Sequence, residues 1–402
     1  MLGGILILLI TGFLAFGFIQ RLKSRYAFLR TFPLKLMFIY HTLLAITYYL
    51  YAQFNASDSE YYYNKVNVFL RGTGWMNYYG TSTAFVEFLV YPLIHFLGFS
   101  YEACMALFSF AGFLGFVYFL IFFKENLKFN HTFFGYDFLK LIFFLPNLHF
   151  WSSSVGKGSL MIMAFGLLFF GINQPGRRWW AVVLGGLLMY HVRAHIMLMV
   201  LVSLIFAFGL SGGGLTFGYR FLIFIVSVIA FVFIYQDVLQ SVGIDQAEFL
   251  SQGLDLTHRA KELSKATSGV DLASYSLPFQ LFTFLFRPLF VDASGFLGLI
   301  VSFENAFYLI MFIRLVSFGG IRFLIQGDYL VKAALFSFFT VALALAQVSG
   351  NLGIAMRQKS QVMLLMLFVI IKYMDEQKLE QYRLQVADRQ KRQLRKQALT
   401  NI

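Results

Sequence analysis

The residues of this chain that could do chemistry are a few ionisable side chains set in otherwise apolar sequence. Two carboxylates, Asp58 and Glu60, lie in a polar segment that follows an apolar run, and an imidazole stands at His195. A carboxylate or an imidazole can act as general base on an incoming hydroxyl group. These three residues are the predicted catalytic residues. Asp58 and Glu60 could instead hold a divalent cation, Mg²⁺ or Mn²⁺, and no other cofactor is expected.

A second set of residues could bind phosphate. Arg presents a planar fork that matches phosphate oxygens, and Lys supplies a point charge. Ionisable groups at membrane depth cost about 2.5–3.5 kcal/mol each on insertion scales, so they usually mark a site. The alternative is that they are anchors that hold helices at the level of the lipid head groups. The predicted phosphate-binding residues are Lys157, Arg193, Arg287 and Arg357.

Aromatic and polar side chains near these residues could bind a sugar. Aromatic faces pack against sugar rings, but tyrosines also form ordinary belts at the membrane interface. Both interpretations stay open for the tyrosines that follow Glu60. The predicted substrate-binding residues are Tyr61, Tyr62, His191 and Asn351.

The elements that must position these residues are membrane-spanning helices. Of the 402 residues, 59% are hydrophobic and 13% are charged, whereas soluble domains are roughly 25% charged. Several stretches run about 18 residues or more with almost no charge, the length that a helix needs to cross hydrocarbon. We attribute the net charge of +13 to cytoplasmic loops and the tail, and we expect no nucleic-acid partner. A single cysteine, Cys104, excludes a disulfide framework and a cysteine-based metal site.

Hydropathy and the placement of Lys and Arg predict an all-α, polytopic bundle of about eleven spans. The N-terminus is predicted outside and the C-terminus in the cytoplasm. Residues 84–98 are apolar but short, and are predicted to lie on the outer interface or dip into it. The predicted spans are 1–19, 34–53, 101–123, 137–151, 159–173, 179–190, 196–210, 221–235, 296–313, 330–346 and 361–373.

Two parts of the chain are therefore expected. Residues 1–373 form the transmembrane domain, with outer loops at 54–100 and 236–285 and an amphipathic helix through 259–265. Residues 374–402 form a basic cytoplasmic helical tail, which fits anionic lipid, a solvated helix or a protein partner. The predicted site residues belong to five separate outer segments. With this topology, all of them lie at about the same depth on the outer face of the membrane.

The order of short motifs resembles bacterial membrane proteins of polysaccharide gene clusters, which are similar to GT-C-type glycosyltransferases and O-antigen polymerases. The resemblance covers most of residues 34–373. The motifs are an acidic first outer loop, interface helices, a Leu-Pro to Gly-Lys turn at 145–157, His-x-Arg-x-His at 191–195, Phe-Arg-Pro at 286–288 and Gly-Asn-Leu-Gly to Arg-Gln at 350–358.

The resemblance implies a GT-C-like fold, polyprenyl-linked sugar donors and an outward-facing active site in the bacterial cytoplasmic (inner) membrane. It implies that Asp58, with Glu60 second, is the acidic residue of the first outer loop. Arg193, Arg287 and Arg357 would be the arginines that bind pyrophosphate. The chain departs from the pattern in the loop at 236–278, which has no matching motif, and in lacking a large outer domain after its helices.

Three functional hypotheses follow. The first is a glycosyltransferase that uses a polyprenyl-(pyro)phosphate-linked sugar and is embedded in membrane lipid. The second is an O-antigen-type polymerase that joins preassembled repeat units. The third is a transporter of a lipid-linked substrate or a non-catalytic membrane subunit. The scarcity of mid-span charges besides Glu304 counts against a transporter.

Overall fold

The computed structural model describes residues 2–69, 74–211, 216–242, 275–293 and 295–400. In that part of the chain the secondary structure is almost entirely helical. The strands there are Thr132–Phe133 (β1) and Tyr136–Asp137 (β2), which pair antiparallel. The predicted all-α class is confirmed. The helix predicted through residues 259–265 lies outside the described residues.

Within each described range the helices follow one another with short connections. In order they are α1 Leu2–Arg25, α2 Thr31–Phe54, α3 Asp58–Asn64, the π-helix η1 Lys65–Phe69, the 3₁₀-helix η2 Trp75–Tyr78, α4 Thr83–His95, α5 Tyr101–Asn126, α6 Phe138–Ile142, α7 Pro146–Trp151, α8 Lys157–Asn173, α9 Pro175–Leu210, α10 Phe217–Val242, α13 Leu277–Phe286, α14 Gly295–Leu315, α15 Phe318–Gln326, α16 Tyr329–Val348, α17 Leu352–Lys359 and α18 Met363–Thr400.

Six helices of the described part are long and apolar enough to cross a membrane: α1, α5, α9, α10, α14 and α16. A seventh is counted if α17 and α18, which meet at a bend of 55°, form one broken span. The chain is therefore a multi-pass helical membrane protein by the length and composition of its helices. The prediction of about eleven spans is not confirmed.

Local breaks and polar residues account for the difference. Residues 137–151, predicted as one span, form the two short helices α6 and α7, because Pro146 lacks an amide donor and starts a new helix. α8 has only 17 residues. α2 has 24 residues, but Lys35, His41 and several tyrosines make it less apolar than the six helices. Residues 84–98, predicted at the interface, form the short apolar helix α4.

The predicted spans 179–190 and 196–210 are the two halves of α9, which breaks at Arg193 (φ −152°, ψ 81°). A Cβ atom added to Gly186 would lie 3.4 Å from the methyl group of Met197. A straight helix would separate these two residues by about 16 Å along its axis. The two halves therefore bend sharply toward each other at Arg193, within the segment 191–195 that was predicted as a turn.

The core of the bundle forms around α5, which packs against α8 through glycines. A Cβ atom on Gly166 would lie 2.4 Å from the carbonyl oxygen of Gly115, and one on Gly115 would lie 2.6 Å from backbone atoms of Ile162. Without side chains at these positions the two backbones touch, which is how small residues bring membrane helices together. This close contact holds α8, which begins at Lys157, against α5.

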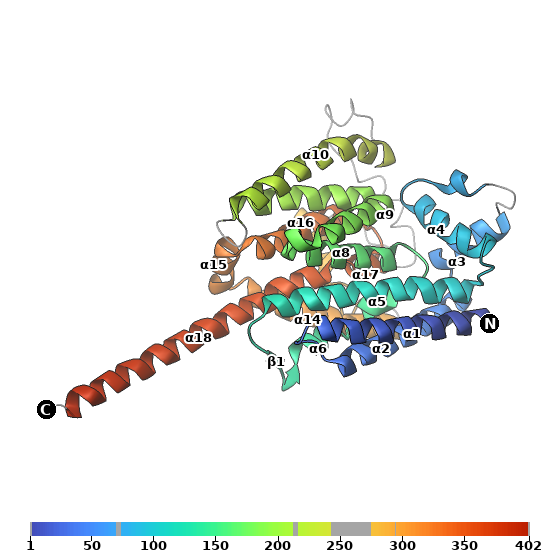
Figure 1. Cartoon of the computed structure of the whole chain (residues 1–402). Coiled ribbons are helices and arrows are strands. Elements are labelled where there is room, and N and C mark those ends of the chain that lie inside the picture. The colour runs from blue at the N-terminus through green and yellow to red at the C-terminus, as the bar shows by residue number, and fades with distance from the viewer. Residues whose placement is uncertain (1, 70–73, 212–215, 243–274, 294, 401–402) are drawn as a thin grey trace.

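The two ends of the bundle differ (Figure 1). α3 and α4 lie at one end, near the N-terminus, and we call this the α3–α4 end. α18 runs out of the bundle at the opposite end, which also holds the α1–α2 turn and β1–β2. We call this the basic end, since it carries Arg25, Arg30, Lys124 and Lys128. The tail predicted from residue 374 onward is the continuation of α18, so it is helical as expected.

Asp375 ties α18 to the rest of the basic end. Its carboxylate accepts hydrogen bonds from the backbone N–H groups of Lys128 and Phe129, at 3.0 and 2.9 Å, and contacts Nε2 of His131 at 3.1 Å. Asp375 is fully buried, and the helix is increasingly exposed beyond it. The exposed part of α18 therefore starts from a fixed point.

Candidate functional site

An ion pair between Asp58 and Arg357 joins the first residue of α3 to the last turn of α17. Nη1 of Arg357 donates to Oδ2 of Asp58, across 299 residues of sequence. The Asp58 side chain is 51% exposed and that of Arg357 is 31% exposed. Both groups therefore remain accessible to a ligand at the α3–α4 end.

Helix capping explains why Asp58 stands where it does. The hydroxyl of Ser57 accepts a hydrogen bond from the N–H of Ser59 at 3.2 Å and so caps α3. The Tyr48 hydroxyl lies 3.0 Å from the Ser57 hydroxyl and fixes this cap to α2. A carboxylate in the first turn of a helix is stabilised by the helix dipole. The cap thus places Asp58 at a favourable position for a negative charge.

Asn351 has the corresponding role for Arg357. Its side-chain oxygen accepts hydrogen bonds from the N–H groups of Gly353 at 2.8 Å and Ile354 at 3.2 Å, which caps α17. Asn351 was predicted to bind substrate. Because its oxygen serves the helix, its structural effect is to orient the helix that carries Arg357.

We expect Asn351→Ala to lower the free energy of unfolding by about 0.5–2 kcal/mol, the usual cost of losing a cap. Asn351→Asp keeps an acceptor at the same position and is expected to stay within about 0.5 kcal/mol of the native chain. The measurement is thermal unfolding of both variants in one detergent. A large loss of stability in Asn351→Asp as well would show that the side-chain amide, and not the cap, matters.

Tyr62 lies at the centre of the charged residues of this end. Its ring is buried beside Gly156, where a Cβ atom would lie 3.5 Å from it. Burial raises the pKa of the Tyr62 hydroxyl to about 12, with Asp58 raising it further and Arg357 and Arg193 lowering it. The charges of three predicted site residues therefore influence the pKa of the Tyr62 hydroxyl.

Lys157 reaches the same place from the start of α8. Its ammonium group donates to the hydroxyls of Ser82 and Thr83, both at 2.9 Å, and the Thr83 hydroxyl also bonds Tyr62. Lys157 therefore shares Thr83 with Tyr62. The backbone of the preceding Gly156 has φ +155°, which favours glycine and lets the chain turn tightly into α8.

Arg193 and the two histidines of the α9 turn are placed differently. Arg193 is buried at the break of α9. The ring of His191 packs against Phe85 at 4.8 Å, with its nitrogens near the carbonyl oxygen of Leu187 at 2.9 Å and the Tyr79 hydroxyl at 3.3 Å. His191 thus holds this part of α9 against Tyr79 and α4. His195 is half-buried in the second half of α9.

Arg287 forms a bidentate ion pair with Asp292. Its Nε and Nη2 atoms donate to the two carboxylate oxygens of Asp292 at 2.7 and 2.9 Å. The hydrogen bonds from Arg287 hold the pKa of Asp292 below its usual range. A guanidinium whose fork is already filled by a carboxylate is poorly suited to bind phosphate. Arg287 is thus held by both oxygens of one carboxylate, whereas Arg357 donates a single hydrogen bond to Asp58.

Glu60 and Tyr61 lie on the same short helix as Asp58. Glu60 is half-buried, and the Tyr61 ring is exposed, with the Lys65 ammonium 6.0 Å from its centroid. An exposed ring beside Asp58 is available to pack against a sugar. In the described part of the chain no three His, Cys, Asp or Glu side chains gather to hold a metal ion.

A buried polar network behind Arg357 was not anticipated. Glu304 accepts hydrogen bonds from the backbone N–H of Asn147 at 2.6 Å and from the Tyr308 hydroxyl at 3.2 Å. The Asn147 amide donates to the carbonyl oxygen of Met356 at 3.3 Å and accepts from Trp151 at 3.0 Å. The network therefore supports α17 beside Arg357. Its sequence signal was the single charge of Glu304 within a predicted span.

Two further imidazoles were also missed. Nδ1 of His41 lies 2.8 Å from Nδ1 of His149, and both rings are fully buried. Their Nε2 atoms face the carbonyl oxygens of Ser109 at 3.0 Å and Phe143 at 2.9 Å. Burial lowers the pKa of both imidazoles, so both rings are neutral near pH 7. A neutral imidazole has one donor and one acceptor nitrogen, so the Nδ1 atom of one ring donates to the Nδ1 atom of the other.

The fold and this site define an all-α, multi-pass membrane protein with a carboxylate–arginine pair open at one end. Comparisons with protein-family models, with curated proteins and with solved structures found no match.

Proposed function

We propose that the chain is a membrane glycosyltransferase that takes a sugar from a polyprenyl-phosphate or polyprenyl-pyrophosphate donor. The reaction would take place on the outer face of the bacterial cytoplasmic membrane, in the assembly of a surface polysaccharide or glycoconjugate. The observation that carries this proposal is the accessible ion pair between Asp58 and Arg357. A base and a phosphate-binding cation are the two groups that such a transfer needs.

The proposed chemistry assigns one role to each group. Asp58 takes the proton from the acceptor hydroxyl, whose oxygen forms a bond to the anomeric carbon of the donor sugar. The bond between that carbon and the phosphate oxygen breaks, and the leaving phosphate keeps the electron pair. Fixed cations stabilise this developing charge in a site of low dielectric constant. Arg357 has five N–H donors, of which one is used for Asp58.

Neighbouring residues support the same assignment. Arg193 and Lys157 supply further positive charge near Tyr62, where the leaving phosphate would lie. Tyr61 offers an exposed ring for the sugar. The concentration of Lys and Arg at the basic end favours that end as the cytoplasmic one. The α3–α4 end, with Asp58 and Arg357, is then the outer end.

The test uses the purified full chain in nanodiscs with a panel of radiolabelled polyprenyl-phosphate sugars. If Asp58 is the base, Asp58→Asn is expected to lower transfer by about 10²–10⁴-fold. Binding of undecaprenyl phosphate, measured in parallel, is expected to change by less than about threefold. The matched control is Asp388→Asn, which removes a carboxylate paired with Arg392 on the exposed part of α18.

Unchanged transfer in Asp58→Asn would rule out the base assignment. No transfer from any donor, together with no binding of undecaprenyl phosphate, would contradict the proposed function as a whole. Transfer of an intact oligosaccharide and not of a single sugar would identify a repeat-unit polymerase.

A further inference from the structure

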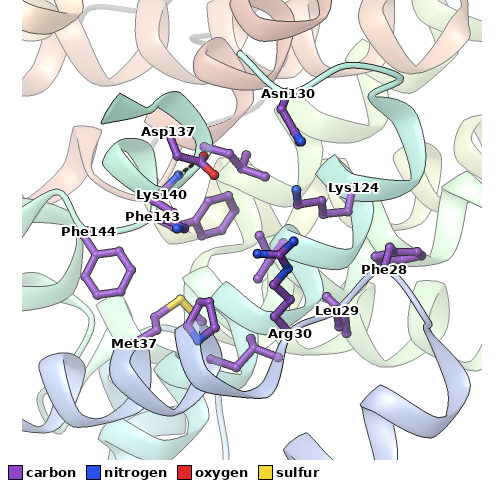
Figure 2. Close-up of a pocket in the computed structure, with 14 residues that line it drawn as sticks. Phe28, Leu29, Arg30, Met37, Lys124, Asn130, Asp137, Lys140, Phe143 and Phe144 are labelled. Carbon is purple, nitrogen blue, oxygen red and sulfur yellow. Dashed lines mark hydrogen bonds between the residues drawn. The ribbon is translucent and has the colours of Figure 1, made fainter. Parts of the chain in front are cut away.

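A pocket of about 330 Å³ opens at the basic end of the bundle, far from Asp58 and Arg357 along α2 and α5. It lies between the α1–α2 turn, the last turns of α5, and the segment from β2 through α6 (Figure 2). None of its lining residues belongs to the candidate functional site. It is therefore a separate feature of the molecule.

One side of the pocket is cationic. Arg30, Lys124 and Lys140 line it together with Asp137, so three cations against one carboxylate leave a net charge of +2. Figure 2 shows the Arg30 guanidinium and the Lys124 ammonium group pointing into the same space, with the Asn130 amide beside them. This arrangement offers an anion several donors at once.

The positive charge of the pocket is not neutralised by the fold. Within the described ranges none of the seven ion pairs involves Arg30, Lys124 or Lys140. Asp137 is already in use, because its carboxylate accepts a hydrogen bond from the N–H of Lys140 at 3.0 Å and caps α6. Like charges held close together without a partner favour a bound anion.

The other side of the pocket is apolar, formed by Leu34, Met37, Leu120, Phe143 and Phe144. A free phosphate ion gains nothing from such a wall, whereas a hydrocarbon chain does. The pocket also stands at the depth of the lipid head groups, since the spans α1 and α5 end next to it at Arg25 and Asn126. Cations above an apolar wall at this depth match a phosphate that carries an acyl chain.

We propose that this pocket binds an anionic phospholipid of the leaflet at the basic end. The phosphate group lies between Arg30, Lys124 and Lys140, and one acyl chain lies along Met37 and Phe143. The bound lipid joins the α1–α2 turn to the β2–α6 segment, two parts of the chain that are about 100 residues apart. This proposal is independent of the reaction at the opposite end.

The test compares lipids and variants of the purified full chain in detergent. Phosphatidylglycerol, phosphatidylcholine and inorganic phosphate are titrated separately, and the unfolding temperature and the lipid retained in native mass spectrometry are measured. The proposal expects phosphatidylglycerol alone to raise the unfolding temperature and to remain bound. If inorganic phosphate at the same concentration raised the unfolding temperature equally, the site would take a free anion. That result would overturn the lipid assignment.

The variant Arg30→Gln with Lys124→Gln is expected to raise the Kd for phosphatidylglycerol by about tenfold or more, the loss typical of charged hydrogen bonds. The matched control, Lys23→Gln with Lys128→Gln, removes two cations of the same end that do not line the pocket. It is expected to change the Kd by less than about twofold. Equal losses in the two variants would mean that phosphatidylglycerol is attracted by the general charge of this end and would overturn the proposal.

Leu120→Trp tests the apolar wall without touching a charge. The larger side chain fills the pocket, so retained phosphatidylglycerol is expected to fall while the unfolding temperature without lipid stays close to that of the native chain. If this variant retained as much phosphatidylglycerol as the native chain, the lipid would bind outside the pocket. That result would overturn the proposal.

Discussion

Arg357→Ala is expected to weaken the binding of undecaprenyl phosphate by about 10- to 150-fold and to abolish transfer. A hydrogen bond to a charged group is worth about 1.5–3 kcal/mol, and each 1.4 kcal/mol is a factor of ten in affinity. The substitution also removes the partner of Asp58. Arg193→Ala, which removes the buried cation near Tyr62, is expected to have the same direction of effect. Equilibrium binding in nanodiscs and the transfer assay measure both.

The control for this prediction is Arg287→Ala. Arg287 is bound at both ends of its fork by Asp292, so its loss is expected to change binding by less than about threefold. Arg357→Lys keeps the charge but not the fork and is expected to fall between the native chain and Arg357→Ala. If Arg287→Ala weakened binding as much as Arg357→Ala, the phosphate would not be bound at the Asp58–Arg357 pair.

Arg178→Ala is expected to destabilise the fold by about 3–5 kcal/mol, the cost of leaving a buried charge without its partner. Nη1 and Nη2 of Arg178 donate to the two carboxylate oxygens of Glu125 at 2.8 and 2.6 Å. The two side chains are only 4% and 12% exposed. The guanidinium also lies 3.8 Å from the centroid of the Phe170 ring. Thermal unfolding in detergent measures the loss.

Two comparisons distinguish the effect of the buried ion pair on stability from the effect of removing any charged side chain. Replacing both partners, Arg178→Met with Glu125→Leu, is expected to recover most of the stability, because no buried charge remains. Arg392→Ala breaks a pair whose side chains are 76% and 58% exposed and is expected to cost less than about 1 kcal/mol. An Arg178→Ala variant as stable as Arg392→Ala would contradict the role of the buried pair.

Hydropathy and charge were enough to predict the helical class, a short apolar segment at α4 and an interruption near residues 191–195. They were not enough for the number of spans. The run 137–151 has the composition of a span, but the break before Pro146 is a local backbone effect that average hydropathy does not register. The spans predicted at 179–190 and 196–210 likewise belong to one helical element, α9, which bends at Arg193.

The candidate site was predicted in part. Asp58 and Arg357 were expected at one end and form an ion pair, and Lys157 shares Thr83 with Tyr62. Their catalytic and phosphate-binding roles stay predictions.

Partners that depend on tertiary contacts were not visible in the sequence. The acceptor of Arg287, Asp292, is five residues away and could have been suspected. Glu304 and Asn147 are 157 residues apart in the sequence, so no local sequence pattern predicts their contact.

Because α18 continues without a break, its far end lies at a defined distance from the helical bundle. Between the anchor at Asp375 and Thr400 the helix continues for about 25 residues, which corresponds to a rise of about 37 Å. A protein bound at its far end would be held on a stiff spacer and not on a loose tether. Its orientation would also be set, because adding a single residue to the helix turns everything beyond it by about 100°.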